Sequence, residues 1–231
     1  MFIPTEHDKI PLVIIDNFLP TDYINSLYVD FEKLKDSFNI SHWTNGIGEE
    51  VKPTHSADDP LNPLCLGEDV WLPFGATEDD NKNIGNCLKN LSQYLFHQGI
   101  LEFLKNSKHY ELKSYAEFFY DFKYHIVNYK NGGYYNWHTD GVVRGPTFAG
   151  NVVEKRNVFT FALTLVKNTE LIKGGDQYFM YKNDIHVSPL KNNQLTIFPS
   201  TVYHSCSEIF APEDLSWENR RFNIQAWLCH I

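Results

Sequence analysis

The fold of this chain is indicated most clearly by one stretch, Tyr134-Tyr135-Asn136-Trp137-His138-Thr139-Asp140-Gly141. It places an imidazole, His138, and a carboxylate, Asp140, two residues apart in an aromatic setting. On a β-strand, residues i and i+2 point to the same face, so the two side chains could hold one metal ion. Taken alone, the pair is explained nearly as well by a turn with a capping aspartate.

A third candidate ligand lies far downstream. His204 follows an apolar run, Leu195–Phe198, that is typical of a buried strand. Two histidines and one carboxylate form a facial triad, which leaves three adjacent positions on an octahedral ferrous ion open. The sequence therefore predicts a metal centre made by His138, Asp140 and His204. The other histidines lack a carboxylate at ligand spacing in such a strand setting.

The order of helical and strand patterns predicts an α+β fold in a single domain, residues 1–231. Residues 1–113 read as a region of helical support and loops, and residues 114–231 as a β-sandwich or barrel. A short buried strand is expected within Ile10–Leu19, and residues 37–73 read as a long, partly ordered loop that is a candidate substrate-binding wall. Helices are expected over residues 22–36 and 80–106, and strands over residues 118–129, 158–166, 177–181, 194–198 and 222–228.

Composition excludes several classes. The net charge of -9 argues against a general nucleic-acid binder, which needs a basic surface for phosphates. The four cysteines form no CxxC pair, so neither a zinc knuckle nor a disulfide framework is expected, and free thiols fit a reducing compartment. The first residues do not resemble a secretion signal, and no apolar run is long enough to cross a membrane. We therefore expect a cytoplasmic protein with no membrane partner.

The motif Tyr129-x-x-Gly132-x-x-Tyr135-x-x-His138-x-Asp140 resembles the first metal-binding strand of the 2-oxoglutarate- and Fe(II)-dependent dioxygenases, particularly their prolyl-4-hydroxylase-like group. Further segments resemble parts of the same family in the same order along the chain: Val13–Leu19, Gly174-Gly175-Asp176, Phe198-Pro199-Ser200 with His204, and Arg220–Trp227. The resemblance implies a double-stranded β-helix core of the jelly-roll, cupin-like kind. It also implies Fe(II), 2-oxoglutarate as cosubstrate, and O2.

The cosubstrate's far carboxylate needs a cation, and arginine binds a carboxylate through two parallel hydrogen bonds. Arg220 and Arg221 compete for this role. If Arg221 faces inward, Asn223, Gln225 and Trp227 share its face, and the alternating apolar residues of the same strand pack outward against the helices. We therefore prefer Arg221, which also has the family's six-residue spacing to Trp227. A surface arginine at the start of a strand remains the alternative.

The resemblance also implies roles for other side chains. Tyr129 resembles the family tyrosine that hydrogen-bonds the cosubstrate. Independently of the resemblance, strand alternation places Thr160 on a threonine-rich face that could line the site, and we expect Thr160 to bind cosubstrate. Tyr135 and Trp137 are expected in the substrate pocket or in packing, and Asn223 is a candidate substrate-binding residue.

Asp140 supplies the carboxylate of the motif that the chain shares with the resembled family, and its presence favours hydroxylation of an unactivated C–H bond. Desaturation and ring formation can begin with the same hydrogen abstraction. We expect the substrate to be either a peptidyl residue, such as proline, or a free amino acid or small metabolite. Two other classes stay open. One is a cupin-type metal-binding protein without oxygenase activity, which would not need Arg221 near the metal. The other is a structural or partner-binding domain without a metal.

Overall fold

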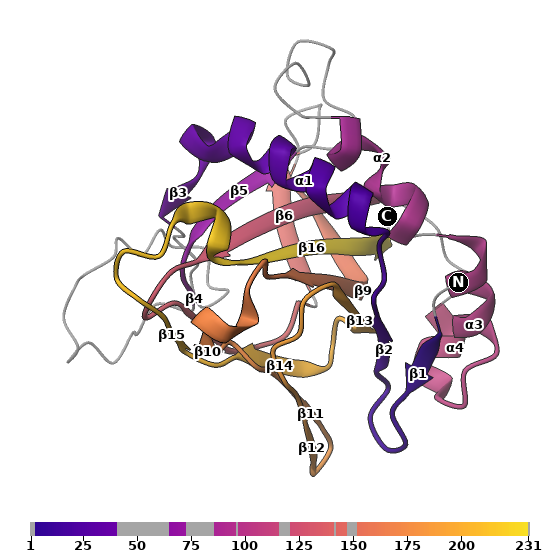
Figure 1. The fold of residues 1–231 in the computed structure, drawn as a ribbon. Helices are drawn as coiled ribbons and strands as arrows, with labels where there is room; N and C mark the ends of the chain where they lie inside the picture. Colours follow the sequence, from indigo (N-terminus) through magenta and orange to yellow (C-terminus); the bar gives the residue numbers. More distant parts are fainter. Residues whose placement is uncertain are drawn as a thin grey trace.

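The computed structural model describes residues 3–40, 65–72, 86–95, 97–115, 121–140, 142–146 and 152–230. In this part of the chain, two antiparallel sheets form a double-stranded β-helix, and helices lie over the outer face of the larger sheet (Figure 1). The prediction of an α+β fold with a jelly-roll core is confirmed. No helix among the described residues is long and apolar enough to cross a membrane.

The larger sheet has the order β1-β2-β13-β9-β16-β6-β5-β3, with β8 paired to β9. Its strands are β1 (Pro4–Glu6), β2 (Val13–Asp16), β3 (Asn39–Ile40), β5 (Glu68–Leu72), β6 (Asp121–Tyr129), β8 (Val142–Pro146), β9 (Val152–Leu165), β13 (Gln194–Pro199) and β16 (Arg221–His230). The strands expected within residues 10–19, 118–129, 158–166, 194–198 and 222–228 are present in the described part of the chain, and residues 118–120 lie outside it. The N-terminal part of the chain thus contributes strands to this sheet as well as helices that cover it.

The smaller sheet has the order β12-β11-β14-β7-β4. Its strands are β4 (Cys65–Leu66), β7 (Tyr134–His138), β11 (Gln177–Tyr181), β12 (Asp184–Ser188) and β14 (Tyr203–Cys206), and β10 (Lys173–Gly174) and β15 (Ile209–Phe210) pair beside it. Within this sheet β14 pairs with β7 so that His204 lies opposite His138. The pairing brings together two residues that are far apart in the sequence.

The helices are α1 (Thr21–Leu34), α2 (Asn86–Leu95), α3 (Gln98–Lys105) and α4 (Tyr110–Tyr115). The apolar stripe of α1 is buried, as its spacing of three and four residues predicts. Asp30, on the same buried face, accepts a hydrogen bond from the Leu88 backbone at 3.3 Å and so ties α1 to α2.

The helical region expected over residues 80–106 is not continuous. It is divided into α2 and α3, and residues 80–85 lie outside the described part. His97 begins the second helix, because its Nδ1 accepts the Gly99 N–H at 3.1 Å and caps an otherwise unpaired donor. The apolar stripe is not continued three and four residues after Leu95, where Gln98 and Gly99 stand. The sequence therefore held a sign of the interruption that the prediction did not use.

The region expected as a loop over residues 37–73 contains strands where it is described. In particular, β5 pairs with β6 along five residues. Gly67 permits the close approach that precedes β5, since a Cβ there would lie 2.9 Å from Val127 Cγ1. The loop prediction is therefore wrong for β3, β4 and β5, and residues 41–64 lie outside the described part.

The main core lies between the helices and the larger sheet. Phe222, Ile224, Ala226 and Leu228 of β16 pack there with alternate residues of β9 and with the stripe of α1. Phe31 stacks on Phe222 with ring centroids 4.8 Å apart. The opposite face of β16 is left for the interior of the jelly roll.

Candidate metal centre and its cavity

Two imidazoles and one carboxylate converge between the sheets. His138 Nε2 lies 3.4 Å from Asp140 Oδ1, and His204 Nε2 lies 3.5 Å from Asp140 Oδ2. Each Nδ1–H donates to the backbone carbonyl two residues earlier, that of Asn136 at 2.7 Å and that of Val202 at 3.0 Å. These bonds fix the tautomer and turn both Nε2 atoms toward the carboxylate. Both Nε2 atoms are buried and have no hydrogen-bond partner among the described residues.

Asp140 is held from four directions. Its backbone N–H donates to Ser200 O at 2.9 Å, and its carbonyl accepts from Asn157 Nδ2 at 2.7 Å. Its Oδ2 accepts from Thr160 Oγ1 at 2.7 Å and from Trp227 Nε1 at 3.0 Å. Because Oδ2 is occupied by these two donors, Oδ1 is the oxygen left to bind a metal.

The electrostatics of the three groups suit a divalent cation. Burial, followed by the neighbouring His138, lowers the pKa of His204 to about 4, so this imidazole is neutral at physiological pH. Burial would raise the pKa of Asp140, but the adjacent His204 and His138 and the Trp227 hydrogen bond outweigh it and hold the pKa well below its usual range. A neutral imidazole with an unprotonated Nε2 and an ionised carboxylate are metal ligands. Among the described residues, these three are the one group of three or more such side chains close enough to share an ion.

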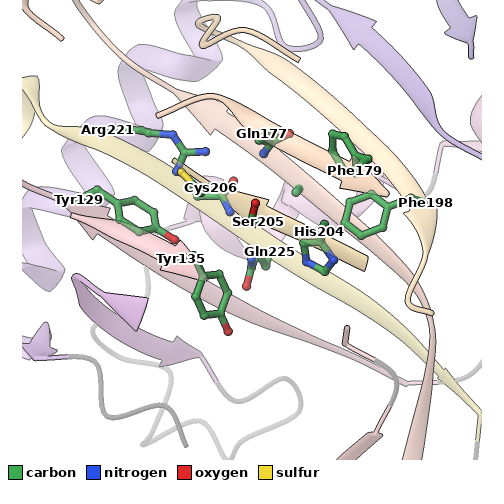
Figure 2. Close-up of a pocket in the computed structure, with 12 residues that line it drawn as sticks. Tyr129, Tyr135, Gln177, Phe179, Phe198, His204, Ser205, Cys206, Arg221 and Gln225 are labelled. Atoms are coloured by element: carbon green, nitrogen blue, oxygen red, sulfur yellow. The ribbon is translucent and has the colours of Figure 1, made fainter. Parts of the chain in front are cut away.

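A cavity adjoins the metal centre inside the jelly roll. Figure 2 shows Arg221 and Tyr129 at one end and His204 with Phe198 at the other. Its lining residues are Tyr129, Tyr135, Ala162, Gln177, Phe179, Phe198, His204, Ser205, Cys206, Arg221, Asn223 and Gln225.

Arg221 is fully buried at the end of this cavity. Its guanidinium lies over the Tyr129 ring at 4.9 Å, and Nη2 reaches Thr164 Oγ1 at 3.5 Å. Nε and Nη1 have no hydrogen-bond partner among the described residues. A buried cation with unused donors is costly unless an anion pairs with it, so this end of the cavity is suited to a carboxylate.

The geometry distinguishes the two neighbouring arginines, Arg220 and Arg221. Arg220 lies outside the cavity lining and donates through Nη1 to Glu68 Oε2 at 3.1 Å. Arg221 has the inward position, as strand alternation predicts. Gly175 leaves room for its stem, because a Cβ there would lie 3.2 Å from Arg221 Cδ.

The structure places the remaining candidates in two groups. Tyr129, Tyr135 and Asn223 line the cavity. Thr160 and Trp137 do not. Thr160, which we expected to bind cosubstrate, instead donates to the ligand carboxylate, and Trp137 is 36% exposed and stacks on Tyr203 at 5.5 Å.

Sequence reasoning missed several side chains that the fold brings to the site. Alternation placed Trp227 on the inward face, but its hydrogen bond to Asp140 was not predicted. His125 was set aside because it has no carboxylate at ligand spacing in the sequence, yet its Nε2 lies 2.9 Å from Asp69 Oδ2. That contact depends on the pairing of β5 with β6, for which the sequence holds no local signal.

Comparison with known proteins supports the fold. The chain is similar to a prolyl-4-hydroxylase from Pseudomonas putida, with 16% identity, a TM-score of 0.57, and coverage of 96% of this chain and 94% of that one. It is also similar to a prolyl hydroxylase from Trichoplax adhaerens in complex with a peptide fragment of hypoxia inducible factor, with 16% identity, a TM-score of 0.62, and coverage of 95% and 84%.

A third similar structure is a non-heme α-ketoglutarate-dependent epimerase from nogalamycin biosynthesis, with 11% identity, a TM-score of 0.51, and coverage of 95% and 78%. No family model and no curated protein matches the sequence. The chain therefore has the fold of the 2-oxoglutarate- and Fe(II)-dependent oxygenases. At these identities, the chemistry must be argued from the site.

Proposed function

We propose that this protein is a 2-oxoglutarate- and Fe(II)-dependent dioxygenase that hydroxylates an unactivated C–H bond. One observation carries the proposal: a triad of His138, Asp140 and His204 shares a cavity with Arg221, a buried guanidinium whose Nε and Nη1 lack partners among the described residues. A metal-binding protein of the cupin type has use for the triad but none for the buried cation. An enzyme with a dicarboxylate cosubstrate needs both.

The residues of the chain divide the work of such an enzyme. His138, His204 and Asp140 Oδ1 would hold Fe(II), and Thr160 and Trp227 would keep the carboxylate in place through Oδ2. When bound, iron and 2-oxoglutarate supply the oxidising chemistry, in which O2 and 2-oxoglutarate become succinate and CO2 and one oxygen atom enters the substrate.

Arg221 would bind the far carboxylate of 2-oxoglutarate, and Tyr129, which packs beneath the guanidinium, is the proposed second contact. Phe179 and Phe198 line the cavity beside His204 and present apolar surface there. Such walls limit access of water to the metal and so protect the oxidant from side reactions.

For the substrate we propose a peptidyl residue, such as proline, with a free amino acid or small metabolite as the other candidate. The peptide bound to the similar Trichoplax adhaerens enzyme supports the first. The similar epimerase shows that this fold also accommodates other reactions, so the fold alone does not select the substrate. A screen of peptides and free amino acids for substrate-stimulated succinate formation, with the mass of the product measured, distinguishes the candidates.

The direct test is anaerobic addition of Fe(II) and 2-oxoglutarate. We expect a weak visible charge-transfer band, which His138→Ala and His204→Ala should abolish. Calorimetry with Mn(II) in place of iron should show 2-oxoglutarate binding to the wild-type protein. Metal binding without any 2-oxoglutarate binding would favour a cupin-type protein instead. Absence of both in folded protein would refute the metal centre.

A further inference from the structure

Three buried polar side chains form a row beside the cavity. Neither the metal site nor the role proposed for Arg221 uses these three side chains. Asp69 lies on β5, His125 on β6 and Gln225 on β16, and Gln225 is the direct cross-strand neighbour of His125. His125 is fully buried, with Nε2 2.9 Å from Asp69 Oδ2 and Nδ1 3.2 Å from Gln225 Oε1. The row therefore runs from a carboxylate, through an imidazole, to an amide that lines the cavity.

The row also fixes one end of that amide. His125 lies between two acceptors, the Asp69 carboxylate and Gln225 Oε1, so in this arrangement it donates from both ring nitrogens. The amide nitrogen of Gln225 is then the end left to face the cavity. The His125 ring is in turn nearly parallel to the Trp227 ring, with an interplanar angle of 21° and centroids 6.1 Å apart. Since Trp227 donates to Asp140, the imidazole lies between a metal-ligand support and a cavity-lining amide.

We propose that Gln225 is a cosubstrate-binding residue that donates its amide N–H to the metal-side end of a bound 2-oxo acid, and that His125 and Asp69 are its positioning residues. This inference rests on the proposed function.

Strand geometry identifies the group that Gln225 would meet. Arg221, Asn223 and Gln225 follow one another at alternate positions on one face of β16, and all three line the cavity that also contains His204. A dicarboxylate with one end at Arg221 and the other near His204 passes along this face and reaches Gln225 at its metal-side end.

The chemistry of the cavity wall supports the same assignment. Beside His204, the side chains of Phe179 and Phe198 offer no hydrogen-bond donor, and the lining side chains near them that can donate are those of Tyr135, Ser205 and Gln225. A carboxylate oxygen that enters this part of the cavity loses its hydration and needs a donor from the wall. An amide held in place by a buried row supplies that donor without a rotamer search on binding.

The test measures 2-oxoglutarate affinity by calorimetry in the Mn(II)-loaded protein, with Mn(II) affinity measured separately. Gln225→Met keeps the length of the side chain and removes the donor, and we expect a loss of affinity of about tenfold or more, the value of one hydrogen bond to a charged group. Mn(II) affinity should change by less than about twofold. Gln194→Met is the matched control, because Gln194 is a buried, hydrogen-bonded amide on β13 that does not line the cavity.

The positioning role is tested by a double-mutant cycle. His125→Phe keeps a ring against Trp227 and removes both nitrogens, and it should weaken 2-oxoglutarate binding nearly as much as Gln225→Met. The double variant should be no weaker than Gln225→Met alone, because a positioning residue acts only through the amide that it orients. Asp69→Asn should give a smaller loss of the same kind, and it tests the row if His125→Phe does not fold.

The outcomes separate this inference from the function on which it rests. No 2-oxoglutarate binding in the wild type would overturn both. Wild-type binding with an unchanged affinity in Gln225→Met would overturn the inference and leave the proposed function standing. Additive losses from Gln225→Met and His125→Phe would show that His125 does not act through Gln225.

Discussion

Replacement of Thr160 by valine tests whether the support of Asp140 matters for metal binding. Valine has the shape of threonine, so the change removes the 2.7 Å hydrogen bond to Asp140 Oδ2 with little loss of volume. A hydrogen bond to a charged group contributes roughly 1.5–3 kcal/mol. At about 1.4 kcal/mol per factor of ten, the loss corresponds to a tenfold to hundredfold weaker metal affinity, the range typical of groups that support metal ligands.

The structure places the expected value at the lower end of that range. Trp227 Nε1 still donates to the same oxygen at 3.0 Å, so the carboxylate keeps one of its two side-chain donors in Thr160→Val. We expect about a tenfold loss of Mn(II) affinity, measured by calorimetry, and a larger loss when Trp227→Phe is added.

Thr196→Val is the matched control. Thr196 is also fully buried, on the neighbouring strand β13, and its hydroxyl bonds Ala162 O and Gln177 Oε1 instead of the ligand carboxylate. It should lower stability by a similar amount and leave Mn(II) affinity within about twofold. Equal Mn(II) affinity in Thr160→Val and wild type, or an equal loss in both variants, would refute the reasoning.

Three further predictions concern Arg221, its glycine neighbour and the titration of the metal-free protein. Arg221→Met removes a buried cation whose Nε and Nη1 lack partners among the described residues, so it should raise the melting temperature of the protein without ligand. It should also abolish detectable 2-oxoglutarate binding, and a lower melting temperature would contradict this reasoning. Gly175→Ala should weaken 2-oxoglutarate binding, measured by calorimetry, more than Gly132→Ala does. Both glycines have a similar positive φ (72° and 74°), but only at Gly175 would the new Cβ meet Arg221. Equal losses of affinity in the two variants would show that backbone strain alone is responsible. The pKa of His204 is about 4 in the folded protein and near 6.5 in the unfolded chain, so the unfolded state binds protons first as the pH falls. The free energy of unfolding should therefore drop as the pH is lowered from about 6.5 to 4. Urea titrations should show this slope in the wild type and a flatter one in His204→Gln.

The sequence predicted those parts of the fold that depend on local periodicity. The central strands β9, β13 and β16 and the helix α1 carry apolar patterns that match their buried faces. The predictions failed for β5 and for the break before α3. β5 is stabilised by its pairing with β6, which hydrophobic spacing does not reveal. The break before α3 coincides with Gln98 and Gly99, which interrupt the apolar stripe and which the prediction did not use.

The same distinction applies to the site. His138 and Asp140 are close in the sequence, and the inward direction of Arg221 follows from alternation along one strand. The support of Asp140 by Thr160 and the row from Asp69 to Gln225 join residues on different strands. Such contacts depend on the registers of several strand pairs at once, and a single sequence does not determine these registers.

Strand β16 explains why the fold and the proposed site are linked so closely. Phe222, Ile224, Ala226 and Leu228 on one face pack in the main core, while Arg221 and Gln225 on the other face line the cavity. A shift of the strand by one residue would place the guanidinium in the apolar core and phenylalanine in the cavity, and both changes are unfavourable. The burial that stabilises the core therefore also sets the direction of Arg221. Core substitutions on β16, such as Ile224→Ala, should consequently weaken 2-oxoglutarate binding only to the extent that they loosen this register.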